Sequence, residues 1–300
     1  MGGSPGQQDV EQAANLAEEA GHDAGVSVRD LDTPAEAAAA SALFDRVWGR
    51  EGEHGAMMAR EALLALAGAG AQLTGAYDGE LVGATVAFLG LSPDGTVYLH
   101  SHITGVVPTA SGRGVGRALK LHQRAWCLQR GITTVRWTFD PLVRRNAVFN
   151  LVGLGAQAVA YEPDRYGTVD DARNAGMPTD RLVASWDLTG PRTQQALSGR
   201  RAEPDVAAVR RSGAEVAVDV DADDAPVVHP TQAPRRLVRI PADIEALRAR
   251  DPDLARRWSE VVRDQLGAPV QSGMRITGMT RDGWYLLATP GGVEELSEQR

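Results

Sequence analysis

A glycine-rich segment between a strand pattern and a helix pattern constrains this chain more than any other feature. The segment runs from Ser111 to Gly116 and has glycine at every second position from 112. Glycine allows left-handed backbone conformations and lets the main chain approach a ligand closely. The amides at the start of the following helix, with the positive end of its dipole, favour a bound anion such as pyrophosphate. Taken alone, the segment is equally well explained as a tight strand-to-helix turn.

The pattern before this segment predicts an antiparallel meander with two helices. Strands are expected at 26–29, 72–77, 81–89 and 97–107, and helices at 35–48 and 56–67. Asp78-Gly79 between two apolar runs predicts a hairpin. A Walker loop would need a lysine that is missing here, and a dinucleotide-binding fold would place its glycines after the first strand of a βαβ unit. In this chain the glycines follow the fourth strand, so neither alternative applies.

The residues around the turn resemble the acetyl-CoA-binding motif of the GNAT acyltransferases. The resemblance rests on Ile-Thr-Gly-Val-Val-Pro at 103–108, on Arg-Gly-Val-Gly-Arg-Ala-Leu at 113–119, and on the order of the expected elements. It covers residues 26–188, and the whole chain resembles a poorly characterised subgroup of predicted GNAT proteins with a C-terminal extension. The resemblance implies an α/β fold with a mixed α+β sheet. It also implies transfer of an acyl group from acetyl-CoA, or another short-chain acyl-CoA, to the amine of a small molecule.

The resemblance further implies a set of residues that bind the acyl-CoA. The strand backbone would orient the thioester, and the amides of the glycine turn would hold the pyrophosphate, with arginines adding positive charge. Asn146, after the next expected strand at 135–139, resembles a residue that hydrogen-bonds the pantetheine arm. The expected set is Thr104, Val106, Val107, Gly112, Arg113, Gly114, Val115, Gly116, Arg117 and Asn146.

A base is also required, because an amine is protonated near neutral pH and must lose a proton before it attacks a thioester. His100 and His102 lie two residues apart in one expected strand, so both should leave the same sheet face. Imidazole titrates near neutrality, and His100 stands where some members of the family carry a catalytic glutamate. A hydrogen-bonded core histidine and a pair of metal ligands are the alternatives. We expect no metal, because no further His/Cys cluster completes a site.

Two positions depart from the family pattern. Ser111 stands where Arg or Gln is usual, and Leu151 stands where the family often has the tyrosine that acts as general acid. Tyr161 and Tyr166 lie just beyond this position, and either could reach the site. Tyr166 is the candidate acid, and core packing is the preferred interpretation of Tyr161. These departures leave two alternatives open, namely a catalytically silent CoA-binding sensor or scaffold and an acyl-CoA decarboxylase on the same fold.

Two groups of polar residues are candidates for binding the acceptor. Arg144 and Arg145, in the loop after the strand at 135–139, could hold a carboxylate by a bidentate pair, or could be solvated loop residues. His54 lies with Glu51 and Glu53 between the first two helices, where the family often shapes its acceptor pocket. A plain surface loop explains this second group equally well.

The composition limits the class of protein and its organisation. A length of 300 residues suits two small domains. We expect a disordered tail at 1–25, the GNAT domain at 26–189, a linker at 190–234 that could contain one hairpin, and an α+β extension at 235–300. The extension could enlarge the sheet, cover its groove or support a homodimer.

Charge, hydropathy and cysteine content exclude several partners. The net charge of −8 provides no electrostatic footprint for nucleic acid. No run of about 18 apolar residues occurs, so no membrane span is expected. A single cysteine, Cys127, indicates a reducing, cytoplasmic setting.

Overall fold

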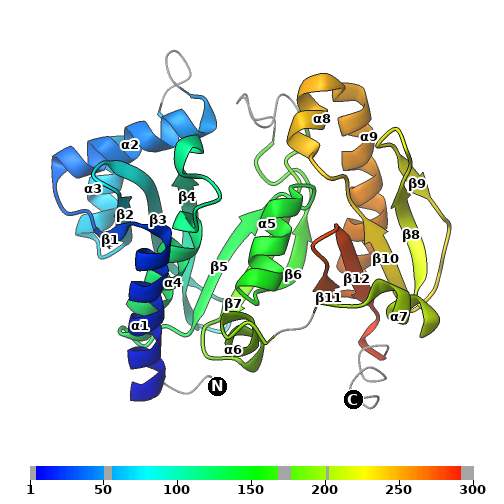
Figure 1. Ribbon diagram of the computed structural model, residues 1–300, viewed down its shortest axis with the longest axis horizontal. Coiled ribbons are helices and arrows are strands. Elements are labelled where there is room, and N and C mark those ends of the chain that lie inside the picture. The colour runs from blue at the N-terminus through cyan, green and yellow to red at the C-terminus, as the bar shows by residue number, and fades with distance from the viewer. Residues whose placement is uncertain (1–4, 51–55, 168–176, 201–202, 292–300) are drawn as a thin grey trace. The chain divides into compact units, whose positions relative to one another are not determined.

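The chain folds into two compact units, described by a computed structural model over residues 5–50, 56–167, 177–200 and 203–291 (Figure 1). The boundary between the units lies inside a strand, between Trp137 and Thr138. The first unit contains the residues before this boundary together with residues 187–189. The second unit contains most of the remaining chain.

The first unit is built on a mixed sheet with the strand order β1-β2-β3-β4-β5. Neighbouring strands are antiparallel from β1 to β4, whereas β4 and β5 are parallel. This confirms the expected meander and the mixed sheet. The strands are β1 (Ser27–Asp30), β2 (Gln72–Tyr77), β3 (Leu81–Leu91), β4 (Val97–Val106) and β5 (Thr134–Phe139).

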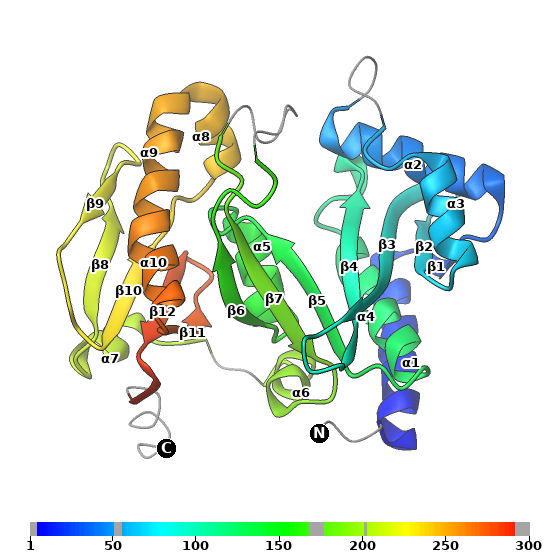
Figure 2. The ribbon, with the colours of Figure 1, turned by 180° about the vertical axis from the view of Figure 1, so that it is seen from behind.

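Two pairs of helices cover opposite faces of this sheet (Figures 1 and 2). The missing side chain of Gly83 leaves room for Val115 of α4 (Val115–Leu128), since a Cβ there would lie 3.0 Å from its Cγ1. On the other face a Cβ at Gly105 would lie 2.9 Å from the ring of Trp48 in α2 (Pro34–Trp48). The α4 helix packs against α1 (Gln7–Ala24), and α2 packs against α3 (Arg60–Gly68).

The start of α2 follows directly from its sequence. Pro34 occupies the first turn, and Thr33 caps the helix by accepting a hydrogen bond from the Glu36 amide at 3.3 Å. The Glu36 carboxylate accepts from the Thr33 amide at 3.0 Å, which completes a capping box.

The expectation of a disordered N-terminal tail is wrong for the residues that the structure describes. Residues 7–24 form the 18-residue helix α1, which ends at Gly25 in the left-handed conformation. Its buried positions are small, including Ala13, Ala20 and Ala24. Alanine is the strongest helix former, and small side chains let two helices pack closely. The segment therefore buries backbone and methyl groups against α4 without the large apolar residues that usually indicate an ordered helix.

The second unit contains an antiparallel strand pair and a second sheet. The pair is formed by β6 (Gln157–Glu162) and β7 (Arg181–Asp187). After β5, the chain forms α5 (Arg144–Val148), which continues into a π-helical turn at Phe149–Gly153. A short helix, α6 (Pro191–Leu197), follows β7.

The second sheet shows that residues 190–234 are more than a linker. Its strand order is β11-β12-β10-β8-β9. The expected hairpin is present as β8 (Glu215–Val220) paired with β9 (Pro226–Val228). However, β8 also pairs in parallel with β10 (Arg235–Arg239), and α7 (Val206–Arg211) packs on the same sheet. A linker assignment misses this because the parallel pairing joins segments whose contact is not local in sequence.

The remaining C-terminal elements match the expected α+β extension. Asp243 caps α8 (Ile244–Arg250), and Pro252 opens α9 (Pro252–Val262). A π-helical turn at Arg263–Gly267 leads into α10 (Ala268–Gln271). The predicted hairpin is formed by β11 (Arg275–Met279) and β12 (Trp284–Ala288).

Candidate functional site

The glycine turn has the backbone that its sequence predicts. Gly112 and Gly114 have φ of +79° and +93°, in the left-handed region that disfavours other residues. No side chain caps α4, whose N-cap is Gly114. The first amides of a helix have no acceptor within the helix. The turn therefore lies at the positive end of the 14-residue helix α4, where main-chain N–H groups favour a bound anion.

The end of α1 lies against this turn, which the sequence analysis did not predict. A Cβ at Gly114 would lie 3.6 Å from the Cβ of Ala24. Arg113 extends from the turn toward Asp78, and their side chains form an ion pair at 2.6 Å. Its second guanidinium nitrogen lies 3.4 Å from the carbonyl oxygen of Ala24. Arg113 thus joins the turn to the β2–β3 hairpin and to the end of α1.

Two other expected cofactor residues have defined surroundings. The Val107 amide donates to the Val82 carbonyl at 2.9 Å, so this N–H is used within the sheet. Arg117 is half-buried, and burial lowers the pKa of its guanidinium, partly offset by the Asp23 carboxylate at the end of α1. Arginine keeps its charge under these conditions, so Arg117 places a cation in the first turn of α4.

A β-bulge interrupts β4 at the two histidines. Val86 pairs with Ile103 and Ala87 pairs with Ser101, so His102 is the extra residue. A bulge reverses the alternation of side chains along a strand. Ser101, before the bulge, points toward α4, where it accepts a hydrogen bond from Lys120. Val106, after the bulge, is also on the α4 face, because it pairs with Gly83, which faces Val115 of α4.

His100 and His102 lie together on one side of the sheet, as predicted. Their ring centroids are 5.9 Å apart, and the Phe88 ring lies 5.1 Å from His100 and 5.7 Å from His102. His100 is half-buried and His102 is exposed. Phe88 therefore contacts both imidazoles beside the bulge.

The parallel pairing of β4 with β5 is short. It joins Leu99 to Val135 and His100 to Arg136, whereas the pairing of β4 with β3 continues to Val106. The segment of β4 from the bulge onward, including Thr104, thus lies beyond its described pairing with β5. This is the segment whose backbone is expected to orient the thioester. The hydroxyl of Thr104 forms a hydrogen bond of 2.8 Å with the hydroxyl of Thr85 on β3.

A buried polar network lies behind the bulge on the α4 face. Lys120, the only lysine in the chain, donates to Ser101 Oγ at 2.8 Å and to Gln123 Oε1 at 3.1 Å. Its ammonium group lies 4.3 Å from the centroid of the Trp137 ring. Burial lowers the pKa of Lys120 to about 7, and the nearby Cys127 partly opposes this shift. The network therefore links the helix of the glycine turn to the strand that carries the histidines.

Lys120 should make the stability of the protein depend on pH. Its amine loses a proton near pH 7 when folded but only near 10.5 when unfolded, so the unfolded state binds more protons in between. The unfolding free energy should therefore rise with pH above 7, by at most about 1.4 kcal/mol per pH unit from this group. In Lys120→Met this contribution is absent. Urea denaturation from about pH 6 to about pH 9 should show that the unfolding free energy of wild type minus that of the variant increases with pH, whereas a constant difference would contradict the assignment.

In the second unit, the tyrosines have different environments. Tyr161 is buried and donates to Asp180 Oδ2 at 2.6 Å, and burial raises the pKa of its hydroxyl far above the ordinary value. Its expected core role is confirmed, and Leu151 is also fully buried. Tyr166 is 46% exposed, and its hydroxyl lies 3.1 Å from Thr138 Oγ1. Of the two tyrosines, only Tyr166 is exposed to solvent.

Arg144 and Arg145, which were expected to bind the acceptor, interact with other residues of the protein. Arg144 donates to the Asp282 carbonyl at 2.8 Å, and Arg145 forms a two-point ion pair with Glu245. Asn146 is partly exposed in the first turn of α5. His54 lies outside the described residues.

Within the described residues, no group of three or more His, Cys, Asp or Glu side chains is arranged to hold a metal ion. No helix in the described parts of the chain is long and apolar enough to cross a membrane.

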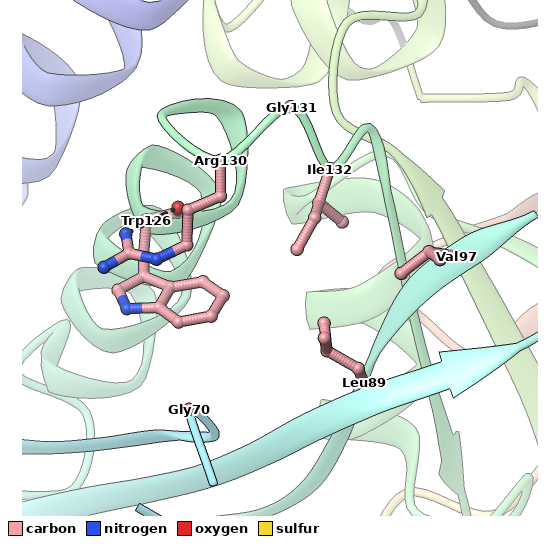
Figure 3. Close-up of a pocket in the computed structure, with 7 residues that line it drawn as sticks. All are labelled: Gly70, Leu89, Val97, Trp126, Arg130, Gly131 and Ile132. Carbon is pink, nitrogen blue, oxygen red and sulfur yellow. Dashed lines mark hydrogen bonds between the residues drawn. The ribbon is translucent and has the colours of Figure 1, made fainter.

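A hollow of about 350 Å³ lies at the other end of α4 from the glycine turn (Figure 3). It is lined by Gly70, Leu89, Val97, Trp126, Arg130, Gly131 and Ile132. The 14 residues of α4 span about 20 Å. The hollow is therefore separate from the glycine turn.

The sequence matches one family whose description agrees with this geometry. Residues 6–140 match the acetyltransferase (GNAT) domain family. The match begins at residue 6 and so includes α1, which agrees with the contact between α1 and the glycine turn. No curated protein matches the chain.

Several solved structures are similar to part of the chain. One is the ribosomal-protein-S18-alanine N-acetyltransferase of Escherichia coli, at 17% identity over 55% of this chain and 95% of that chain, with a TM-score of 0.42. Another is FeeM, an N-acyl amino acid synthase from uncultured soil microbes, at 16% identity over 57% and 96%, with a TM-score of 0.42. The assignment to a family rests on the family match at residues 6–140 and not on these structures. The chain therefore contains a GNAT acetyltransferase domain at residues 6–140, which places the protein among the acyltransferases.

Proposed function

We propose that the protein transfers an acetyl or other short acyl group from coenzyme A to an amine of a small molecule. The observation that carries this proposal is the left-handed glycine turn at the start of α4, which follows β4, the strand that carries the bulge and the two histidines, after one short 3-10 turn at Pro108–Ala110. The turn offers amides to a pyrophosphate, and the histidines offer a base beside the same strand. The family match at residues 6–140 supports the coenzyme A thioester as donor.

In the proposed reaction the amine, the thioester and one base meet at β4. His100 removes a proton from the ammonium form of the acceptor, directly or through one water. The neutral amine attacks the thioester carbonyl, the new amide bond forms and the carbon–sulfur bond breaks. The amides of residues 112–116 hold the pyrophosphate, and the backbone at Thr104 and Val106 orients the thioester. The attacking nitrogen loses its second proton as the amide forms, and the leaving thiolate takes that proton up, with Tyr166 as the candidate residue that relays it.

Two other activities compete with this proposal. A CoA-binding sensor would bind coenzyme A without transferring an acyl group, and Leu151 in place of the usual tyrosine favours that candidate. An acyl-CoA decarboxylase would release CO₂ from malonyl-CoA without an acceptor. Transfer to a panel of amines and CO₂ release from malonyl-CoA distinguish the three activities.

The first experiment is a thermal-shift measurement against a panel of CoA thioesters. A ligand at 100 times its dissociation constant adds about 2.7 kcal/mol to the apparent stability. We expect a rise in the melting temperature that depends on the acyl group, with the preferred donor giving the largest rise. If neither coenzyme A nor any thioester shifts the melting temperature, the glycine turn is only a turn and the proposal is withdrawn.

A further inference from the structure

The bulge in β4 decides which of its side chains face α4. Ser101 and Val106 both lie on that face, although a regular strand would place residues five apart on opposite faces. His100, next to Ser101, points to the face away from α4, and its ring lies 5.9 Å from that of His102. The register that puts Ser101 against α4 on one face therefore also sets the histidine rings on the other.

A buried hydrogen bond fixes Ser101 on the α4 face. Ser101 and Lys120 are 4% and 5% exposed, and Nζ of the lysine lies 2.8 Å from Oγ of the serine. Burying either group without its partner costs free energy, so each holds the other in place. The ammonium group also donates to Gln123 at 3.1 Å and lies 4.3 Å from the centroid of the Trp137 ring. Lys120 thus has partners besides Ser101 that keep it in position.

This hydrogen bond does not require the charge of the lysine. Burial lowers the pKa of Lys120 to about 7, so both protonation states are populated near neutral pH. A neutral amine keeps two N–H groups, and the network offers it two oxygen acceptors, on Ser101 and Gln123. Burial also keeps a substrate away from Lys120 and Ser101, so the two residues can affect a reaction only through the strand.

The same helix also packs tightly on the sheet beyond the bulge. A Cβ at Gly83 would lie 3.0 Å from Cγ1 of Val115, and Gly83 pairs with Val106. A slip of β4 by one residue would turn the Ser101 hydroxyl away from Lys120, because neighbouring residues of a strand face opposite sides. Helix α4 therefore fixes the register on both sides of the bulge, by a polar contact before it and by close packing after it.

We propose that Lys120 is a positioning residue for the histidine pair, which through Ser101 holds the bulge of β4 in the register that places His100 and His102 side by side. The consequence for catalysis rests on the proposed function, in which His100 is the base. The placement of the two rings does not rest on it, and can be measured in the protein without a substrate.

Three variants and one control test this inference. Ser101→Ala removes the acceptor on β4, Lys120→Met removes the donor on α4, and the double variant removes both. If the lysine acts through the serine, the effects of the single variants should not add in the double variant. Ser259→Ala is the matched control, because Ser259 is also 4% exposed and its hydroxyl bonds to the Ala255 carbonyl of its own helix, α9.

The first readout is the titration of the two imidazoles by NMR, with resonances assigned from His100→Gln and His102→Gln. Both titration curves should shift in Ser101→Ala and in Lys120→Met, and exchange of the His102 amide should become faster. Ser101→Ala keeps the lysine, so a shift in that variant reports a change of geometry and not the loss of a charge. Ser259→Ala should give the wild-type curves.

The second readout is acyl transfer. In Ser101→Ala and Lys120→Met we expect kcat to fall about tenfold, because a small displacement of a reacting group is costly. Coenzyme A affinity, measured by calorimetry, should change less than about twofold, since an effect on the base appears in kcat and not in binding. Ser259→Ala should keep both values.

The outcomes separate this inference from the proposed function. Unchanged imidazole curves in Ser101→Ala and Lys120→Met overturn the inference, and acyl transfer by wild type then still supports the proposed function. Additive effects in the double variant also overturn the inference. If wild type transfers no acyl group, the proposed function fails, and the imidazole curves still decide the inference. If Lys120→Met does not fold, equal curves in Ser101→Ala and Ser259→Ala overturn it.

Discussion

His100→Gln is expected to lower kcat/KM for acyl transfer at neutral pH by about 10²- to 10⁴-fold, the usual contribution of a general base. Glutamine keeps a polar side chain of similar size beside Phe88 but cannot accept the proton. The rise of kcat/KM with pH that an imidazole base produces near neutrality should disappear. Thiol release from the best thioester, with an amine identified in the panel, provides the assay.

His102→Gln is the matched control for this variant. The ring of His102 contacts the same Phe88 and lies 5.9 Å from the ring of His100, but His102 is the extra residue of the bulge and is exposed. We expect a smaller loss and an unchanged pH dependence. Both variants should keep the thermal shift produced by coenzyme A, which separates loss of the base from loss of binding. Unchanged turnover of His100→Gln at every pH from about 6 to about 9 would show that His100 is not the base.

The second large effect is expected from Gly114→Glu. This variant puts a side chain at a backbone position with φ of +93° and adds a negative charge where the pyrophosphate is expected. Like charges brought together in a binding site cost several kcal/mol, so coenzyme A affinity should fall by at least about 30-fold, or on the order of 2 kcal/mol. Calorimetry with coenzyme A provides the measurement, and the thermal shift should disappear with it.

Gly95→Glu controls for the backbone strain. Gly95 has φ of +81° in the β3–β4 turn, and a Cβ there meets no atom within 4 Å. Both variants place glutamate at a left-handed position, and the Cβ added at Gly114 makes only an ordinary contact of 3.6 Å with Ala24. Each variant should lose on the order of 1 kcal/mol of stability from that conformation. Only Gly114→Glu should lose coenzyme A. Equal affinities in the two variants would remove the glycine turn from the binding site.

Much of the candidate site could be predicted because its determinants are local. Gly112 and Gly114 specify a left-handed turn through their own conformational freedom, and Asp78-Gly79 specifies a hairpin in the same way. The two histidines were expected on one sheet face, and their rings are neighbours. Such features depend on a few adjacent residues, so the sequence shows them without knowledge of the tertiary fold.

Other parts of the site depend on contacts between distant segments. The bulge at His102 becomes visible only when β4 is paired with β3, and it puts Ser101 and Val106 on the same face of the sheet although they are five residues apart. An odd spacing would place them on opposite faces of a regular strand. Neither residue type indicates a bulge.

By itself the sequence determined the strand-and-helix order of the first unit from β1 onward, the glycine turn and the helix starts in that part, because capping, turn chemistry and apolar periodicity act over a few residues. Only the tertiary structure decided that the N-terminal tail is helix α1 against the glycine turn, that the single lysine is buried behind the histidines, and that Arg144 and Arg145 are held by the C-terminal segment. Burial and ion pairing at these positions depend on partners from 19 to 138 residues away in sequence. No local pattern records such partners, because they are brought together only when the chain packs.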